Sequence, residues 1–395
     1  MNRASRKIFG TLFFSIFTVV TGTGIVVPML PVYAHSLGAS GLYIGMIFGA
    51  FSLSRTFCLP LFGTLSDQKG RKPFIVAGLF FYAVISAAFI LSTTVSSLIT
   101  VRFAHGIASA MVMPVVQAYV GDITPKGREG WVMGLFNMSM MTGLSAGPVL
   151  GGVIMHSFGL QTTFVCMGVM SLLAFGMSLV FLPPTAEEQV MTKDRRAVKW
   201  SVLLTDRPLL GLFLFRVGYT GCIGIIWGFL PIFGDVTFSL SSLAIGLLVT
   251  LMTFVSGLIQ VPMGWTADRY SRKVMVVLGG SVVTLSVFLF SQATGFQSLL
   301  MASILFGVGG GISMPALMAG AVLRGKQKSA MGPVMALLTL GHSLGMMAGS
   351  ILAGVIVDLF EIRHAFMLGS FSMVMGVVGF VWLTRGENLA SRQAP

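Results

Sequence analysis

The feature that most constrains this chain is a polar segment that occurs twice, each time between two long apolar stretches. Residues 63–72 read GTLSDQKGRK, and residues 264–273 read GWTADRYSRK. Matched Gly and Met-Pro positions follow both copies in the same order. A polar loop repeated at the same place in two apolar halves indicates a duplicated, membrane-embedded helix bundle.

The composition excludes a water-soluble domain. Charged residues make up 9% of the chain and hydrophobic residues 55%, whereas a soluble domain has about 25% charged residues. The apolar runs are long enough to cross a bilayer as helices of about 20 residues. The three cysteines all lie inside these runs, so they suggest neither a disulfide framework nor a metal site. We expect no cofactor and no metal.

The hydrophobic pattern predicts an all-α integral membrane protein with twelve transmembrane helices in two pseudo-symmetric six-helix bundles. The polar stretch 185–207 divides an N-terminal bundle (1–184) from a C-terminal bundle (208–395) and is expected to be a cytoplasmic linker. The predicted spans are approximately 9–33, 42–64, 73–93, 97–121, 130–156, 161–182, 208–233, 242–264, 273–292, 298–322, 330–357 and 364–384.

Basic residues set the expected orientation. With the N-terminus in the cytoplasm, nearly every loop Lys and Arg falls on the cytoplasmic side, and the opposite side holds only Arg363. This bias follows the positive-inside rule and places both termini in the cytoplasm. It also explains the net charge of +13 without nucleic acid as a partner.

Four motifs carry a family resemblance. Segment 63–72 resembles the loop motif between the second and third helices of the major facilitator superfamily, and Arg102 with Gly106 resembles its fourth-helix motif. Segment 143–152 resembles the fifth-helix motif of its proton-linked exporters, and segment 24–31 resembles the first helix of drug:proton antiporters, including tetracycline exporters. The resemblance implies a secondary transporter of a bacterial inner membrane.

The repeated loop supplies candidates for conformational gating. Asp67 and Arg71 lie four residues apart at a helix end, so they can share one face. The resemblance places Asp122 near Arg71, and the second copy offers Asp268 and Arg272. Such a cluster could latch the cytoplasmic ends of helices. The alternative is that these charges only set the orientation.

A stripe of small residues marks the fifth span. Gly143, Gly147 and Gly151 recur every four residues, which lets another helix approach closely, and Pro148 can bend the helix. In the family the fifth and eleventh helices meet across the two halves, so the resemblance implies an outer seal and pivot. The alternative is ordinary membrane packing.

Ionisable residues inside spans are candidates for function, because charge at bilayer depth is costly. Arg55 lies twelve residues before Asp67, about 18 Å along a helix at 1.5 Å per residue, and Arg216 lies inside the seventh span. We expect both to bind a negatively charged cargo. The alternative is that each pairs with helix-end carbonyls or polar neighbours. Gln117, Asn137 and Gln260 are further cargo-binding candidates.

No Asp or Glu lies deep in a predicted span, although many proton-linked exporters carry a carboxylate in the first helix. The remaining coupling candidates are Arg102, His105, His342 and Asp235. Histidine titrates near neutrality and can carry a proton; the alternative for each histidine is a packing role. The resemblance makes Arg102 a ligand of first-helix backbone, sometimes linked to proton transfer.

The sequence therefore predicts a carrier, and not an enzyme. It exports a small amphipathic compound, drug-like or an organic anion, by alternating access, with protons as the candidate coupling ion. The alternative is an uncoupled or lipid-handling carrier of an organic anion or lysolipid-like molecule. The expected partners are the small-molecule substrate and the lipid bilayer, and the expected state is a monomer.

The orientation has a direct test. A green fluorescent protein fused after Pro395 should fluoresce in cells, and alkaline phosphatase fused there should be inactive, because the C-terminus stays in the cytoplasm. A phosphatase fusion at Arg363 should be active and serves as the control. An active C-terminal phosphatase would contradict the predicted topology.

Overall fold

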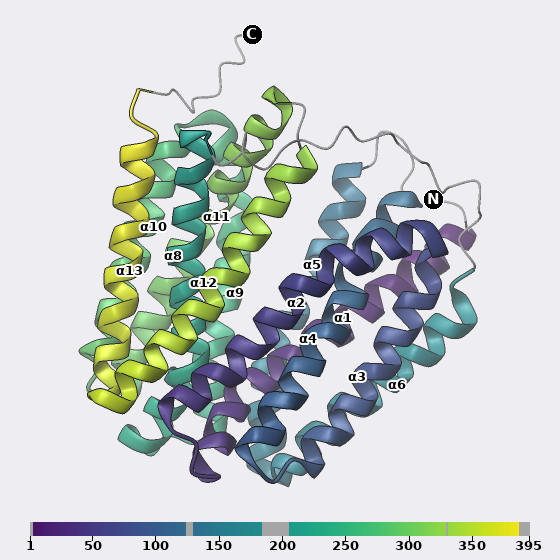
Figure 1. Cartoon of the computed structure of the whole chain (residues 1–395), viewed down its shortest axis with the longest axis horizontal. Helices are drawn as coiled ribbons and strands as arrows, with labels where there is room; N and C mark the ends of the chain where they lie inside the picture. Colours follow the sequence, from purple (N-terminus) through teal and green to yellow (C-terminus); the bar gives the residue numbers. More distant parts are fainter. Residues whose placement is uncertain (1–2, 124–128, 184–204, 329–330, 387–395) are drawn as a thin grey trace. The chain divides into compact units, whose positions relative to one another are not determined.

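A computed structural model describes residues 3–123, 129–183, 205–328 and 331–386 as long helices joined by short connections (Figure 1). Twelve helices in this part are long and apolar enough to cross a membrane, which confirms the predicted spans. Most of the predicted linker, 185–207, lies outside the described residues. The helices are α1 (Arg3–Ser36), α2 (Gly41–Lys69), α3 (Arg71–Leu91), α4 (Val95–Asp122), α5 (Glu129–Phe158), α6 (Leu160–Phe181), α8 (Arg207–Ile232), α9 (Ser242–Arg269), α10 (Arg272–Ser291), α11 (Phe296–Gln327), α12 (Met331–Leu359) and α13 (Ile362–Leu383), and the short π-helix η2 (Phe233–Thr237) follows α8.

Helices form here because hydrocarbon offers the backbone no hydrogen-bonding partner, so each spanning segment must satisfy its own amides and carbonyls. Proline inside such helices is tolerated where neighbouring helices and side chains compensate for the lost donor. Pro114 in α4 and Pro315 in α11 occupy equivalent positions of the repeat. The two halves therefore share a proline at the same place inside a continuous helix as well as polar loops.

The first polar loop turns sharply at a glycine. Gly70, between α2 and α3, has φ 87°, a conformation that L-residues with a side chain rarely adopt. Its repeat equivalent, Ser271, has φ −64°. The glycine of the motif is therefore required in the first copy and not in the second.

The chain divides into two compact units. Unit 1 comprises residues 1–39, 50–194 and 241–250, and unit 2 comprises 40–49, 195–240 and 251–395. In unit 1, α1 packs against α5 and α6, and α3 packs against α4 and α6; in unit 2, α8 packs against α12 and α13, and α10 packs against α11 and α13 (Figure 1). Each unit thus has the same packing pattern, as the internal repeat predicts.

Two helices contribute to both units. The first turns of α2 belong to unit 2, where the amides of Gly41 and Leu42 donate to the Asp358 carboxylate at 2.6 and 2.8 Å. The first turns of α9 belong to unit 1, where Thr250 Oγ1 donates to the Ser145 carbonyl at 3.0 Å. Asp358 therefore caps a helix that continues into the other unit.

The glycine stripe of α5 packs against α1 within unit 1. A Cβ on Gly143 would lie 2.9 Å from the Phe17 carbonyl oxygen, and one on Gly151 would lie 2.9 Å from that of Ile25. A Cβ on Gly147 would lie 2.7 Å from the Cα of Gly24, which also touches Pro148. The expected close packing is present, here against α1. The expectation that the fifth and eleventh helices meet across the two halves stays a prediction.

The equivalent stripe of α12 packs against α8 within unit 2. A Cβ on Gly341 would lie 3.0 Å from the Phe213 ring, and the backbone of Val217 and Gly221 blocks Cβ positions on Gly345 and Gly349. Small residues at this spacing bring two helix backbones into contact. The repeat therefore preserves one helix–helix contact in each unit.

Replacing Gly147 by Ala should destabilise the protein by about 1–3 kcal/mol, because its Cβ would press on backbone atoms that have little room to move. Gly176→Ala in α6 is the matched control, since no atom lies within 4 Å of its Cβ position. Thermal unfolding of both variants in detergent measures the difference. Equal unfolding temperatures would contradict the close packing of α1 and α5.

Candidate functional site

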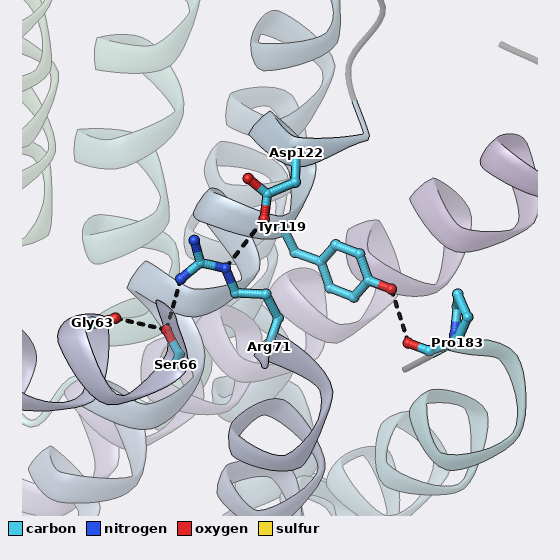
Figure 2. Close-up of polar contacts among 6 residues, drawn as sticks. All are labelled: Gly63, Ser66, Arg71, Tyr119, Asp122 and Pro183. Atoms are coloured by element: carbon cyan, nitrogen blue, oxygen red, sulfur yellow. Dashed lines mark hydrogen bonds and ion pairs between the residues drawn. The ribbon is translucent and has the colours of Figure 1, made fainter. Parts of the chain in front are cut away.

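Arg71 is held at the end of unit 1 where the first polar loop lies (Figure 2). Its Nε lies 3.2 Å from Oδ2 of Asp122, and its Nη1 donates to Ser66 Oγ at 2.8 Å. Ser66 Oγ donates in turn to the Gly63 carbonyl at 2.8 Å. The guanidinium therefore joins the last turns of α2 and α4 through charged and neutral hydrogen bonds, and the predicted pairing of Arg71 with Asp122 is present.

A second contact in Figure 2 extends this cluster. Tyr119, one turn before Asp122 on α4, donates its hydroxyl to the Pro183 carbonyl at 3.0 Å. Pro183 follows the end of α6. The same end of α4 thus contacts both α3 and the segment that leaves α6. The side chain of Asp67, the other predicted gating acid, lies outside the described part of the chain.

The second copy of the loop keeps the arginine, but the residues equivalent to its two acceptors have changed. At the spacing that relates Arg71 to Arg272, Ser66 is replaced by Ala267 and Asp122 by Leu323. Arg71 donates through Nε and Nη1. The same two atoms of Arg272 are buried and have no hydrogen-bond partner among the described residues. The side chain of Asp268 is not described. The repeat has therefore diverged at its most polar point.

Unit 2 uses a different ion pair, which the sequence did not predict. Asp206 accepts a hydrogen bond from the Leu209 amide at 3.0 Å and so caps the N-terminus of α8. Its Oδ2 also lies 2.8 Å from Nζ of Lys328, which follows α11. An Asp before an Arg-Pro pair predicts a helix N-cap from sequence alone. The pairing of this Asp with Lys328 could not be predicted, because the lysine is distant in sequence.

A buried arginine–histidine pair lies in the core of unit 1. Arg102 and His105 on α4 are 1% and 0% exposed, and Arg102 Nη1 lies 3.2 Å from His105 Nδ1. The guanidinium carbon of Arg102 lies 4.5 Å from the ring centroid of Phe51. Rings of Phe51, Tyr82 and Phe89 surround the imidazole at centroid distances of 5.2, 4.9 and 5.9 Å. The pair is sealed from solvent.

The first helix carries polar groups that sequence reasoning passed over. Thr18 and Thr21 on α1 are 1% and 0% exposed, and their hydroxyls have no hydrogen-bond partner among the described residues. They occupy the segment in which proton-linked relatives were expected to carry a carboxylate. Two unsatisfied hydroxyls at this depth are unusual.

A second arginine–histidine pair lies in unit 2, on two different helices. Arg216 on α8 places Nη2 3.3 Å from Nδ1 of His342 on α12, and its Nη1 donates to the Met314 sulfur at 2.8 Å. Nε of Arg216 is buried without a partner among the described residues. Both Arg216 and His342 are partly exposed. The structure thus joins a predicted cargo-binding residue to a predicted coupling residue.

The other candidates are dispersed. Arg55 on α2 is partly exposed, and its buried Nε has no partner in the described part of the chain. Gln117 is exposed on α4, and Gln260 Nε2 donates to Ser256 Oγ at 3.1 Å on α9. Asp235 is partly exposed in η2. The side chain of Asn137 lies outside the described residues.

A sequence model of the Major Facilitator Superfamily matches residues 12–241 and 219–395. The chain belongs to the Major Facilitator Superfamily. It is therefore an integral membrane transporter, which agrees with the twelve apolar helices of the structure.

Similarity to individual superfamily members extends over the whole chain. Multidrug resistance protein 2 of Bacillus subtilis is 26% identical and covers 98% of each chain. Quinolone resistance protein NorA of Staphylococcus aureus is 32% identical over 55% of this chain and 58% of its own length. A crystal structure of a bacterial homologue of the human lysosomal transporter Spinster superposes with a TM-score of 0.86 over 100% of both chains at 11% identity, which is similarity of fold alone.

Identical substitutions at the two repeat-equivalent arginines should have unequal effects. Arg71→Met should lower the free energy of unfolding by about 1.5–3 kcal/mol, because it removes hydrogen bonds from a charged group that is 13% exposed. Arg272→Met should be neutral or stabilising, because it removes buried donors without acceptors. Thermal unfolding of the two purified variants measures both effects. Equal destabilisation would contradict the divergence of the two loops.

Proposed function

We propose that this carrier exports a small amphipathic compound, drug-like or an organic anion, by alternating access, with protons as the coupling ion. Superfamily membership and the similarity to proteins named for multidrug and quinolone resistance support the export of such compounds. We place the carrier in a bacterial inner membrane as a monomer with both termini in the cytoplasm.

The proposal of an anionic cargo rests on arginines at bilayer depth that have no neutralising acid among the described residues. Arg55 and Arg216 each keep a buried Nε without a partner in the described part of the chain. Among the described residues, Arg216 contacts an imidazole and a thioether, and neither carries negative charge. An unneutralised guanidinium in a low-dielectric site attracts an anion strongly. Gln117, Asn137 and Gln260 would add neutral hydrogen bonds to the cargo.

The proposed gate is the cluster around Arg71 and Asp122, together with Asp67, Asp268 and Arg272. A charged cluster that joins helix ends can stabilise one of two conformations, and its loss would shift the balance to the other. The glycines of α5 and Pro148 would let α1 and α5 move as one packed pair.

An uncoupled carrier of an organic anion or lysolipid-like molecule is the second candidate. The carboxylates of the described spans, Asp122, Asp235 and Asp358, lie near span ends. The lack of a deeper one favours this candidate, because the usual proton carrier of exchange transporters is a deep carboxylate. Arg102, His105, His342 and Asp235 would then serve packing or cargo binding instead of proton transfer.

Transport in proteoliposomes tests the proposal. Purified carrier should accelerate the movement of anionic and uncharged amphipathic dyes relative to protein-free liposomes. An imposed pH gradient should then drive the dye to a concentration ratio above one, because only coupled transport responds thermodynamically to that gradient. If the concentration ratio of the dye never exceeds one, the carrier is uncoupled, and the second candidate replaces the leading proposal.

A further inference from the structure

The first turn of α2 is held on α12, within unit 2, by a carboxylate. The amides of Gly41 and Leu42 donate to the two oxygens of Asp358, at 2.6 and 2.8 Å. Both amides belong to the start of α2, where backbone donors have no acceptor inside their own helix. A carboxylate at this position also meets the positive end of the helix dipole. Asp358 therefore supplies an N-terminal cap to α2 from another helix.

Close packing of the two backbones surrounds this cap. A Cβ on Gly41 would lie 2.5 Å from the Gly354 carbonyl oxygen, and a Cβ on Gly45 would press on the backbone of Ser350. The hydroxyl of Ser350 donates to the Gly45 carbonyl at 3.1 Å. Small residues at these positions let the two helices touch. The start of α2 is thus held on α12 by packing and by hydrogen bonds.

The internal repeat places an equivalent packing contact in unit 1, between α9 and α5. By the spacings of the repeat, Gly45 corresponds to Gly246, and Ser350 corresponds to Gly152. A Cβ on Gly246 would lie 3.4 Å from the Cα of Gly152. Each unit therefore holds the first turns of a helix that continues into the other unit.

The two contacts differ in how their helix is capped. His156 occupies the position of Asp358 in the repeat. The start of α9 carries a cap of its own, because the hydroxyl of Ser241 accepts a hydrogen bond from the Ala244 amide at 3.3 Å. A cap from the same helix stays in place when the helix moves, whereas a cap from α12 is lost when α2 leaves α12. Release of α2 therefore costs two charge-assisted hydrogen bonds.

The position of α2 in the chain connects this cost to transport. Residues 41–49 of α2 belong to unit 2, and the rest of the helix belongs to unit 1. Alternating access requires that the two halves of a carrier move against each other, so α2 must either bend or detach from α12. The predicted topology places the start of α2 and the end of α12 on the outer side. A contact that is present in only one of two conformations stabilises that conformation.

We propose that Asp358 is an outer gating residue, whose hydrogen bonds to the start of α2 stabilise the conformation that is closed toward the outside. Opening toward the outside requires their release. This inference rests on alternating access in the proposed function, and it adds an outer counterpart to the cytoplasmic cluster around Arg71. Asp358 is a positioning residue, since it acts through α2 and not through contact with the cargo.

Hydrogen–deuterium exchange of the full-length carrier in lipid nanodiscs, read by mass spectrometry, tests this role. Asp358→Asn keeps the shape of the side chain and removes its charge. Exchange over residues 40–49 should become about ten-fold faster, because the cap and its charge are lost together. Exchange at the opposite ends of α2 and α4, over residues 63–72 and 116–123, should become slower, because opening of one side closes the other.

Two controls separate a gate from a general or local effect. Glu361→Gln should leave exchange unchanged, because Glu361 is a nearby exposed acid whose side chain caps no helix. Ser241→Ala removes the cap that α9 carries itself, so it should accelerate exchange at the start of α9 alone. If Asp358→Asn does not fold, Gly41→Ala gives a second test, because its Cβ would press on the Gly354 carbonyl. It should produce the same pattern at both ends of α2.

Unchanged exchange in Asp358→Asn would overturn the inference. Faster exchange confined to residues 40–49 would also overturn it, because Asp358 would then be a local helix cap and not a gate. Slower exchange over residues 63–72 in Glu361→Gln as well would show a general effect of charge, with the same consequence. These measurements need neither cargo nor a pH gradient, so their failure leaves the proposed function standing. A carrier that shows the expected pattern but moves no dye would keep the gate and lose the function.

Discussion

The cost of charge in a low-dielectric environment determines how this protein is built. Deep arginines are expensive unless a neighbouring group compensates them, and the described spans offer them imidazole, thioether and aromatic partners in place of carboxylates. Arg102 is enclosed by Phe51 and His105, whereas Arg216 is partly exposed beside His342. The first arrangement encloses its charge within the unit, and the second is the one for which we propose a role in cargo binding.

The two units of the duplicated fold share their close helix packing and differ in their polar contacts. Each unit retains a glycine stripe that brings two helix backbones together, because any added side chain would force the helices apart. The polar loops have diverged. Arg71 keeps both of its acceptors, while Arg272 has Ala267 and Leu323 at the equivalent positions, and unit 2 pairs Asp206 with Lys328 instead. Conformational control is therefore expected to be asymmetric between the units.

The fold was predictable from the sequence, because hydrophobic length and loop charge are local properties. The twelve spans, the repeat and the pairing of Arg71 with Asp122 follow from them, the last with the help of the family resemblance. The contact of Arg216 with His342 joins residues 126 apart, and Asp358 caps α2 from more than 300 residues away. Such contacts depend on which helices pack together.

The central claim is that Arg55 and Arg216 serve the cargo and not the fold, whereas Arg102 serves the fold. Replacing each in turn by Met, and measuring both the unfolding temperature and the transport rate of the purified carrier, tests this claim most directly. Arg55→Met and Arg216→Met should unfold at the same or a higher temperature and lose transport of anionic cargo, while Arg102→Met should unfold at a lower temperature. Comparable destabilisation by all three substitutions, or full transport by the first two, would contradict the account.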